Sequence, residues 1–304
     1  MNKDHNIICK LLSGAVFACV LVAPAGAQTT FDTPEVAANS LVVALARGDQ
    51  QALVDILGDD GMDLLPAGEE SEDLVERFLN GWIKFHGFEA TASDTRLLAV
   101  GEHGWTLPIP IVRSKEGWHF DTVAAQHLIK VRKIGENELS VIQSLLAYHD
   151  AQVEYAQHDW DKDGRLEYAQ RFVSTPGTHD GLYWATAPGE PQSPLGPLLA
   201  AHEPGTAYHG YFYRILTGQG EYANGGAVSY VDNGNMTAGF GIVAWPAEYG
   251  STGVMSFMMG RDGRVYEADL GPQGADYAST LSNVDPDGRW APSLDVFDDL
   301  VDLR

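Results

Sequence analysis

The chain has 304 residues, of which 19 are lysine or arginine and 42 are aspartate or glutamate. The formal net charge of −23 at pH 7 argues against nucleic acid or anionic lipid as a partner, because both would be repelled. The same acidity suits a solvated exported protein and favours binding of a divalent cation. A chain of this length can bury one or two hydrophobic cores.

Residues 1–27 predict an export signal that is cleaved after Ala27. Lys3 and Lys10 precede the apolar stretch "LLSGAVFACVLVA", and Ala25 and Ala27 give the small-x-small pattern that signal peptidase accepts. The apolar stretch is too short to span a membrane comfortably. We therefore expect a periplasmic or extracellular protein with no membrane span after cleavage.

Both cysteines, Cys9 and Cys19, lie inside this signal. A rival interpretation is lipoprotein processing at Cys19, but Phe17 fits that pattern poorly and the cut would shorten the apolar core. The mature chain then has no cysteine for a disulfide or a thiolate metal site. Its stability must come from its hydrophobic core.

Residues 28–125 predict one α+β domain in which helices precede an antiparallel sheet. Asp32 or Thr33 is expected to cap a helix that starts at Pro34 and ends at Gly48. Two further helices are expected, at residues 50–57 and, for "SEDLVERFLNGWIKFHGF", at residues 71–88. Strands are expected in "TRLLAVG" and in "WTLPIPIVRSKEGWHFDT", which is broken by a turn at Ser114–Gly117.

Residues 126–304 predict a second α+β domain. A long amphipathic helix is expected to begin near Gly135–Asn137 and to stop at an acidic loop. Residues 175–210 are rich in proline and glycine and too long for a simple connector, so we expect an irregular loop. Such loops are usually functional or disordered, and Tyr183 and Trp184 argue against pure disorder here. The remaining segments alternate apolar and polar residues like strands, with a hairpin turn at Asp262–Gly263.

The acidic loop "DWDKDGRLEYA" has the ligand spacing of a calcium site. Asp159, Asp161 and Asp163 occupy its first, third and fifth positions, Arg165 would offer its backbone carbonyl, and Glu167 would bind directly or through water. The twelfth position holds Gln170 instead of the usual glutamate. We expect a structural Ca²⁺ ion that locks the turn between helix and loop.

The alternative for this loop is a polar helix end closed by Gly164. Three carboxylates within five residues repel one another, and aspartates at a helix C-terminus oppose the helix dipole. A bound cation removes both penalties, which favours the calcium site over a simple turn.

No catalytic constellation is apparent, and we predict no catalytic or cofactor-binding residue. The 10 histidines form no zinc-binding spacing, and the serine in "YGSTGV" lacks the pattern of a nucleophile elbow. A set of aromatic residues in the second half would either line a recognition groove or fill the core, and we favour the core. They are Tyr183, Trp184, Tyr208, Tyr211, Tyr213, Trp245 and Tyr249.

Several longer sequence segments resemble those of a known family. "FDTPEVAANSLVVALARGDQQALVDILG", "GWTLPIPIVRSKEGWHFDT", "DWDKDGRLEYAQRF", "STPGTHDGLYW" and "YHGYFYRILTGQG" together resemble the exported bacterial family of unknown function 2950 (DUF2950). The resemblance covers nearly all of the mature chain. It implies no activity.

Two further resemblances concern the fold. The region from Thr33 to Asp121, ending in "GWHFD", is similar to NTF2-like (SnoaL-like) domains, which form a cone of helices against a curved sheet. Enzymes with this fold carry an acidic or histidine base in the pocket of the cone, and His86, Glu89 and His103 are the nearby candidates here. The fold alone hosts many functions.

The region from Asn137 onward, with "NELSVIQSLLAYHDAQVEYA" and "GYFYRIL", is similar to the globular part of type IV pilins and pseudopilins. The resemblance implies a long helix packed on an antiparallel sheet. An entire domain precedes this helix, and the helix is amphipathic rather than wholly apolar, so we expect no polymerisation into a pilus.

We therefore predict an exported, non-enzymatic binding or assembly scaffold with a structural calcium loop. Its partner would be an envelope protein or a glycan. The alternative is a hydrolase that acts on cell-envelope material, with its site in the NTF2-like pocket or under the loop of residues 175–210.

Overall fold

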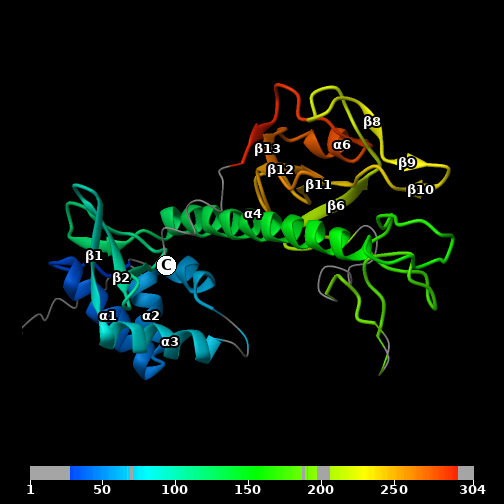
Figure 1. Cartoon of the computed structure of the whole chain (residues 1–304). Helices are drawn as coiled ribbons and strands as arrows, with labels where there is room; N and C mark the ends of the chain where they lie inside the picture. Colours follow the sequence, from blue (N-terminus) through cyan, green and yellow to red (C-terminus); the bar gives the residue numbers. More distant parts are fainter. Residues whose placement is uncertain are drawn as a thin grey trace, which may run out of the picture. The chain divides into compact units, whose positions relative to one another are not determined.

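The computed structural model describes residues 28–66, 68, 71–186, 189, 191–196 and 206–293. The expected signal peptide and both cysteines lie outside the described residues, as does part of the loop 175–210. The chain divides into two compact units, Met1–Gln126 and His127–Arg304, so that the division falls within helix α4 (Thr122–Tyr155; Figure 1). Both units combine helices with antiparallel sheets, which confirms the α+β class.

Unit 1 begins with three helices and a 3-10 turn. These are α1 (Pro34–Arg47), α2 (Gln50–Leu57), η1 (Asp59–Leu64) and α3 (Ser71–Lys84). The side chain of Thr33 caps α1 by accepting a hydrogen bond from the Val36 N–H, and Gly48 ends the helix in the left-handed conformation at φ 63°.

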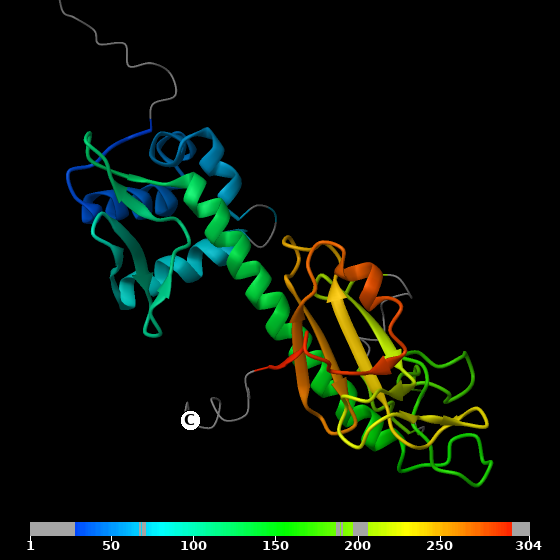
Figure 2. The same ribbon diagram turned by 90° about the horizontal axis from the view of Figure 1, so that it is seen from above.

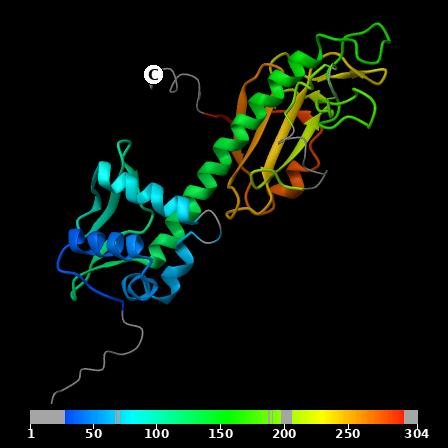
Figure 3. The same cartoon turned by 90° about the horizontal axis from the view of Figure 1, so that it is seen from below.

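The sheet of unit 1 has the order β1-β2-β4-β5, with β3 also paired to β2, and every pairing is antiparallel. Its strands are β1 (His86–Ala92), β2 (Thr95–Val100), β3 (Trp105–Thr106), β4 (Ile111–Arg113) and β5 (Trp118–Phe120). Helices α1 and α3 both contact this sheet (Figure 3). Leu41, Leu57, Leu98, Ile111 and Phe120 form the centre of its hydrophobic core.

Two helix boundaries differ from those predicted. The third helix ends at Lys84, because residues 86–88 begin strand β1 and pair with β2. The long helix α4 starts at Thr122 instead of near Gly135–Asn137, since the Asp121 carboxylate accepts a hydrogen bond from the Ala124 N–H at 2.8 Å and caps it. Gly135 therefore lies inside the helix.

Unit 2 is built on a sheet with the order β15-β13-β12-β11-β6. These strands are β6 (Tyr211–Leu216), β11 (Gly241–Pro246), β12 (Met255–Gly260), β13 (Val265–Asp269) and β15 (Ala291–Pro292), and all pair antiparallel. As predicted, Asp262–Gly263 lies in the turn between β12 and β13.

Smaller elements complete unit 2. Strands β7 (Gly218–Gln219), β8 (Val228–Ser229) and β14 (Asn283–Val284) form a second sheet, and β9 (Val231–Asp232) pairs with β10 (Asn235–Met236) as a short hairpin. The short helix α6 spans Gly274–Ala278. Within the described residues between α4 and β6, the backbone pairs only in isolated bridges.

The second part of α4 packs along the five-stranded sheet of unit 2 (Figure 2). The buried Tyr148 hydroxyl donates to the Gly241 carbonyl at 3.2 Å, and the Glu138 carboxylate accepts from the N–H groups of Val254 and Met255 at 2.9 and 3.0 Å. These contacts join the helix to β11 and to the start of β12.

The aromatic residues of the second half mostly fill the core. Trp184 and Tyr211 are buried in it, and Tyr183, Tyr213 and Trp245 pack against it. The preference for a core role is confirmed for these five. No helix among the described residues is both long and apolar enough to cross a membrane.

Candidate metal centre

The acidic loop follows directly on the C-terminal end of α4 and makes a tight turn. Lys162 and Gly164 both have left-handed backbone conformations, with φ of 64° and 88°. The Asp159 carboxylate holds the turn, because it accepts hydrogen bonds from the N–H groups of Lys162 at 2.8 Å and of Gly164 at 2.9 Å. The Asp163 carboxylate accepts in the same way from the Arg165 N–H at 2.8 Å.

This turn brings three carboxylates together at the surface. One oxygen from each of Asp159, Asp161 and Asp163 lies within 4.8 Å of the others, and all three residues are exposed. Ca²⁺ binds oxygen at about 2.3–2.6 Å, so two ligands of one ion lie at most about 5 Å apart. The three oxygens therefore fit ligation of one cation.

Glu167 lies at the border of this group. It is half-buried, and burial raises the pKa of its carboxyl; the nearby Asp161, Asp163 and Asp159 raise the pKa further, against a hydrogen bond from the Met236 N–H. Its electrostatic coupling to all three aspartates identifies it as a neighbour of the cluster. It is not one of the three carboxylates that close to within 4.8 Å.

The β9–β10 hairpin supports the loop from another part of the chain. The Asn235 amide donates to Asp163 Oδ2 at 2.7 Å, and the Gln170 amide donates to the Gly234 carbonyl at 2.7 Å. The Tyr168 N–H donates to the Met236 carbonyl at 2.7 Å. Gln170, at the twelfth position of the loop, therefore holds the hairpin.

An aromatic cluster supports the loop from the other side. The Trp160 side chain, between two of the aspartates in sequence, lies with its ring centre 4.9 Å from that of Trp184 and 5.0 Å from that of His179. Its indole N–H donates to the Tyr155 carbonyl at 3.0 Å. The acidic loop is thus joined to the following segment of residues 175–184.

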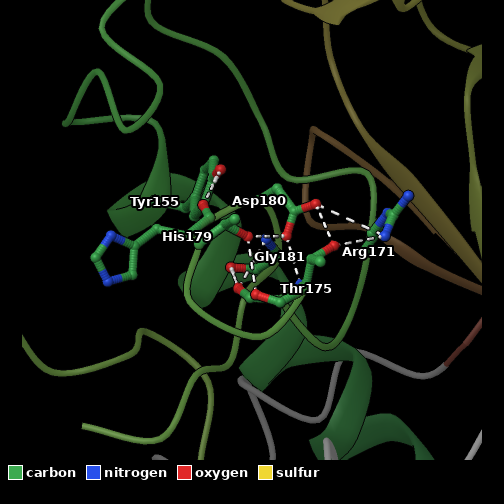
Figure 4. Close-up of polar contacts among 8 residues, drawn as sticks. Tyr155, Arg171, Thr175, His179, Asp180 and Gly181 are labelled. Atoms are coloured by element: carbon green, nitrogen blue, oxygen red, sulfur yellow. Dashed lines mark hydrogen bonds and ion pairs between the residues drawn. The ribbon is translucent and has the colours of Figure 1, made fainter. Parts of the chain in front are cut away.

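A polar cluster around Asp180 holds that segment (Figure 4). The Asp180 carboxylate accepts from the Thr175 N–H at 2.6 Å and from the hydroxyls of Thr175 and Thr178 at 2.8 Å, with Arg171 at 3.6 Å. Burial raises the pKa of Asp180, but these hydrogen bonds and Arg171 outweigh it and lower the pKa overall. Groups of residues 171–178 thus occupy the hydrogen-bonding positions of the Asp180 carboxylate, and the cluster orders the loop.

The three candidates for a base in unit 1 do not converge. The unit contains a cavity of about 570 Å³, and His103 and Glu102 lie on its lining, whereas His86 and Glu89 do not. The His86 ring stacks on Trp82 at 3.8 Å, and its Nδ1 lies 2.9 Å from the Trp82 carbonyl oxygen. Of the three candidates, His103 is therefore the one that lies at this cavity.

Residues 28–292 match a family described as protein of unknown function (DUF2950). The chain belongs to this family. No curated protein matches the chain, and no solved structure matches it. Membership of DUF2950 assigns no activity, so the function must be argued from the geometry.

In this DUF2950 chain, sequence spacing found the aspartates but missed the residues that support them. Asn235 and Met236 lie more than 70 positions away from Asp163, and nothing in their local sequence marks them. Trp160 had a signal, because an aromatic residue inside an otherwise polar loop must be packed against something.

Proposed function

We propose that this DUF2950 chain is an exported, non-enzymatic binding scaffold whose acidic loop holds a structural Ca²⁺ ion. The observation that carries the calcium site is the approach of the Asp159, Asp161 and Asp163 oxygens to within 4.8 Å of one another. Glu167 and the backbone carbonyl of Arg165 would complete the ligand set. Water would fill the remaining positions, as at other exposed calcium loops.

The physical reason is charge. Three carboxylates so close together repel one another, and an ion with two positive charges converts this repulsion into attraction. The ion would also stabilise whatever the loop touches: the hairpin through Asn235, and the segment of residues 175–184 through Trp160.

We also propose the finer fold assignments. Unit 1 would be an NTF2-like domain, supported by helices packed on an antiparallel sheet beside a cavity. Unit 2 would be a pilin-like domain, supported by the packing of α4 along the antiparallel sheet. The partner would be an envelope protein or a glycan, reached after export by the signal in residues 1–27.

The test of the calcium site uses terbium, which binds calcium sites and emits light when a nearby indole transfers energy to it. Trp160 lies between two proposed ligands, so the purified chain should sensitise terbium emission and Ca²⁺ should displace the ion. Saturating Ca²⁺ should raise the melting temperature of unit 2 by roughly 5 to 10 °C, because binding at about 100 times Kd adds about 2.7 kcal/mol.

The double substitution Asp161→Ala with Asp163→Ala should abolish both effects. The matched control is Asp59→Ala with Asp60→Ala, which removes the same charge from exposed positions of η1 and should leave both effects intact. A chain that neither sensitises terbium nor gains stability with Ca²⁺ would refute the calcium site. A pull-down from envelope extract tests the scaffold role separately. If it yields the same amount of a partner with and without Ca²⁺, binding of that partner does not depend on the metal.

A further inference from the structure

The cavity in unit 1, of about 570 Å³, has walls that are almost wholly apolar. They come from α1, η1, α3, the end of β2 and the segment that leads to β4. Representative lining residues are Leu41, Leu45, Leu64, Phe78, Trp105 and Ile109. Cavities of roughly 300–1,000 Å³ with such walls are typical of small-molecule sites.

Helix α3 borders this cavity with apolar side chains that stay partly accessible. The helix has an apolar face that includes Leu74, Val75 and Phe78, yet none of its 14 residues is buried. A surface helix normally packs its apolar stripe against the core. Phe78 of this stripe packs against the core of unit 1, but Leu74 and Trp105 on the cavity lining remain 39% and 51% exposed.

The polar groups on the lining are few. Among the described residues of the lining, Arg77 of α3 is the one cation at neutral pH, and no described carboxylate forms an ion pair with it. Glu102 and His103 are the other titratable residues in the described part of the lining. Apolar walls with one unpaired guanidinium complement a molecule that has an alkyl tail and an anionic head.

We propose that this cavity binds a single long-chain carboxylate of the fatty-acid type, as distinct from an anionic lipid surface, which the net charge of −23 would repel. The tail lies against the leucines, Phe78 and Trp105, and the carboxylate pairs with Arg77, which is suited to two parallel hydrogen bonds. Burial of the tail removes the exposed apolar surface of α3 and Trp105 from water. This site is separate from the acidic loop, and its occupancy requires no calcium.

The first test measures binding of decanoate, dodecanoate and dodecanol to the purified chain by calorimetry, in the presence of a chelator. Affinity should increase about fourfold for each added methylene, since each is transferred from water to an apolar wall. Dodecanol should bind about tenfold more weakly than dodecanoate, because it lacks the charge that pairs with Arg77.

Two matched pairs of variants locate the site. Leu74→Glu should weaken dodecanoate binding at least tenfold, whereas Ile83→Glu should leave it unchanged; Ile83 is on the same helix, is 79% exposed and does not line the cavity. Arg77→Gln should remove the preference for dodecanoate over dodecanol. Lys84→Gln, on α3 but away from the lining, should retain this preference.

Leu74 and Ile83 are both exposed, so neither variant is expected to unfold the unit, and circular dichroism checks this. The proposal is overturned if no carboxylate binds, if affinity is independent of tail length, or if Leu74→Glu and Ile83→Glu behave alike. It is also overturned if Leu74→Glu converts a dimer to a monomer without any binding of dodecanoate, because a second copy of the chain would then be the occupant.

Discussion

The effect of pH and Ca²⁺ on the stability of a Glu167 variant distinguishes a metal-binding loop from a polar turn. The pKa of Glu167 lies above the usual value of 4.5 because of burial and because of the neighbouring aspartates. A carboxyl with a raised pKa in the folded chain is ionised at a cost to stability above that pKa. The cost disappears when the pH falls below the unfolded value and the group is protonated in both states.

We therefore predict that Glu167→Gln stabilises the chain at pH 7 in the presence of a chelator, and that this gain vanishes near pH 4. With Ca²⁺ the sign reverses, because the substitution removes a ligand; the affinity for Ca²⁺ should fall on the order of tenfold or more. Urea unfolding of unit 2 at both pH values, with and without Ca²⁺, measures the four combinations.

Glu154→Gln is the control for this experiment, since it removes an exposed carboxylate of α4 that does not belong to the cluster. It should respond to neither pH nor Ca²⁺ in this way. If Glu167→Gln destabilises the metal-free chain at pH 7, the aspartates do not act on Glu167 as described.

Helix α4 is the element for which local sequence was most misleading. The sequence predicted that the helix starts near Gly135–Asn137, and Gly135 is a poor helix former. In the structure α4 runs from Thr122 through Gly135 to Tyr155. The cap at Asp121 and the packing of the apolar positions on either side outweigh the low propensity of one glycine.

We predict that Gly135→Ala raises the free energy of unfolding by about 0.5–1 kcal/mol. A Cβ at this position meets no atom within 4 Å, and alanine reduces the freedom of the unfolded chain. Gly48→Ala is the contrasting control, because φ of 63° at the end of α1 strains any residue with a side chain and should lower stability. A loss of stability in Gly135→Ala would contradict a continuous helix at this point.

For the whole molecule, the important feature is that it has two separate hydrophobic cores. The core of unit 1 includes Leu57, the core of unit 2 includes Leu145, and the two share no buried residue. Each unit therefore has its own source of stability.

We predict two transitions in calorimetry, of which Ca²⁺ raises only the one that belongs to unit 2. Leu57→Ala and Leu145→Ala assign the transitions, because each removes a fully buried side chain and should cost about 2–5 kcal/mol in its own unit. A single transition would contradict independent units. If Ca²⁺ instead shifted the transition that Leu57→Ala lowers, the metal would bind in unit 1, and the proposed site would be wrong.

The sequence by itself determined those features that depend on residues close together along the chain. The cap of α1 at Thr33, its end at Gly48, the turn at Asp262–Gly263 and the spacing of the acidic loop all depend on a few consecutive residues. Hydrophobic periodicity also predicted the α+β class, because the buried positions recur about every 3.6 residues in a helix and every second residue in a strand.

Only the tertiary structure decided which distant groups meet. The contact of Asn235 with Asp163, the environment of Trp160, and the apolar cavity that His103 lines but His86 and Glu89 do not all depend on how strands and helices pack. The physical reason is that caps and turns are decided by local backbone energetics. A binding site is decided by register and packing between segments that no local pattern links.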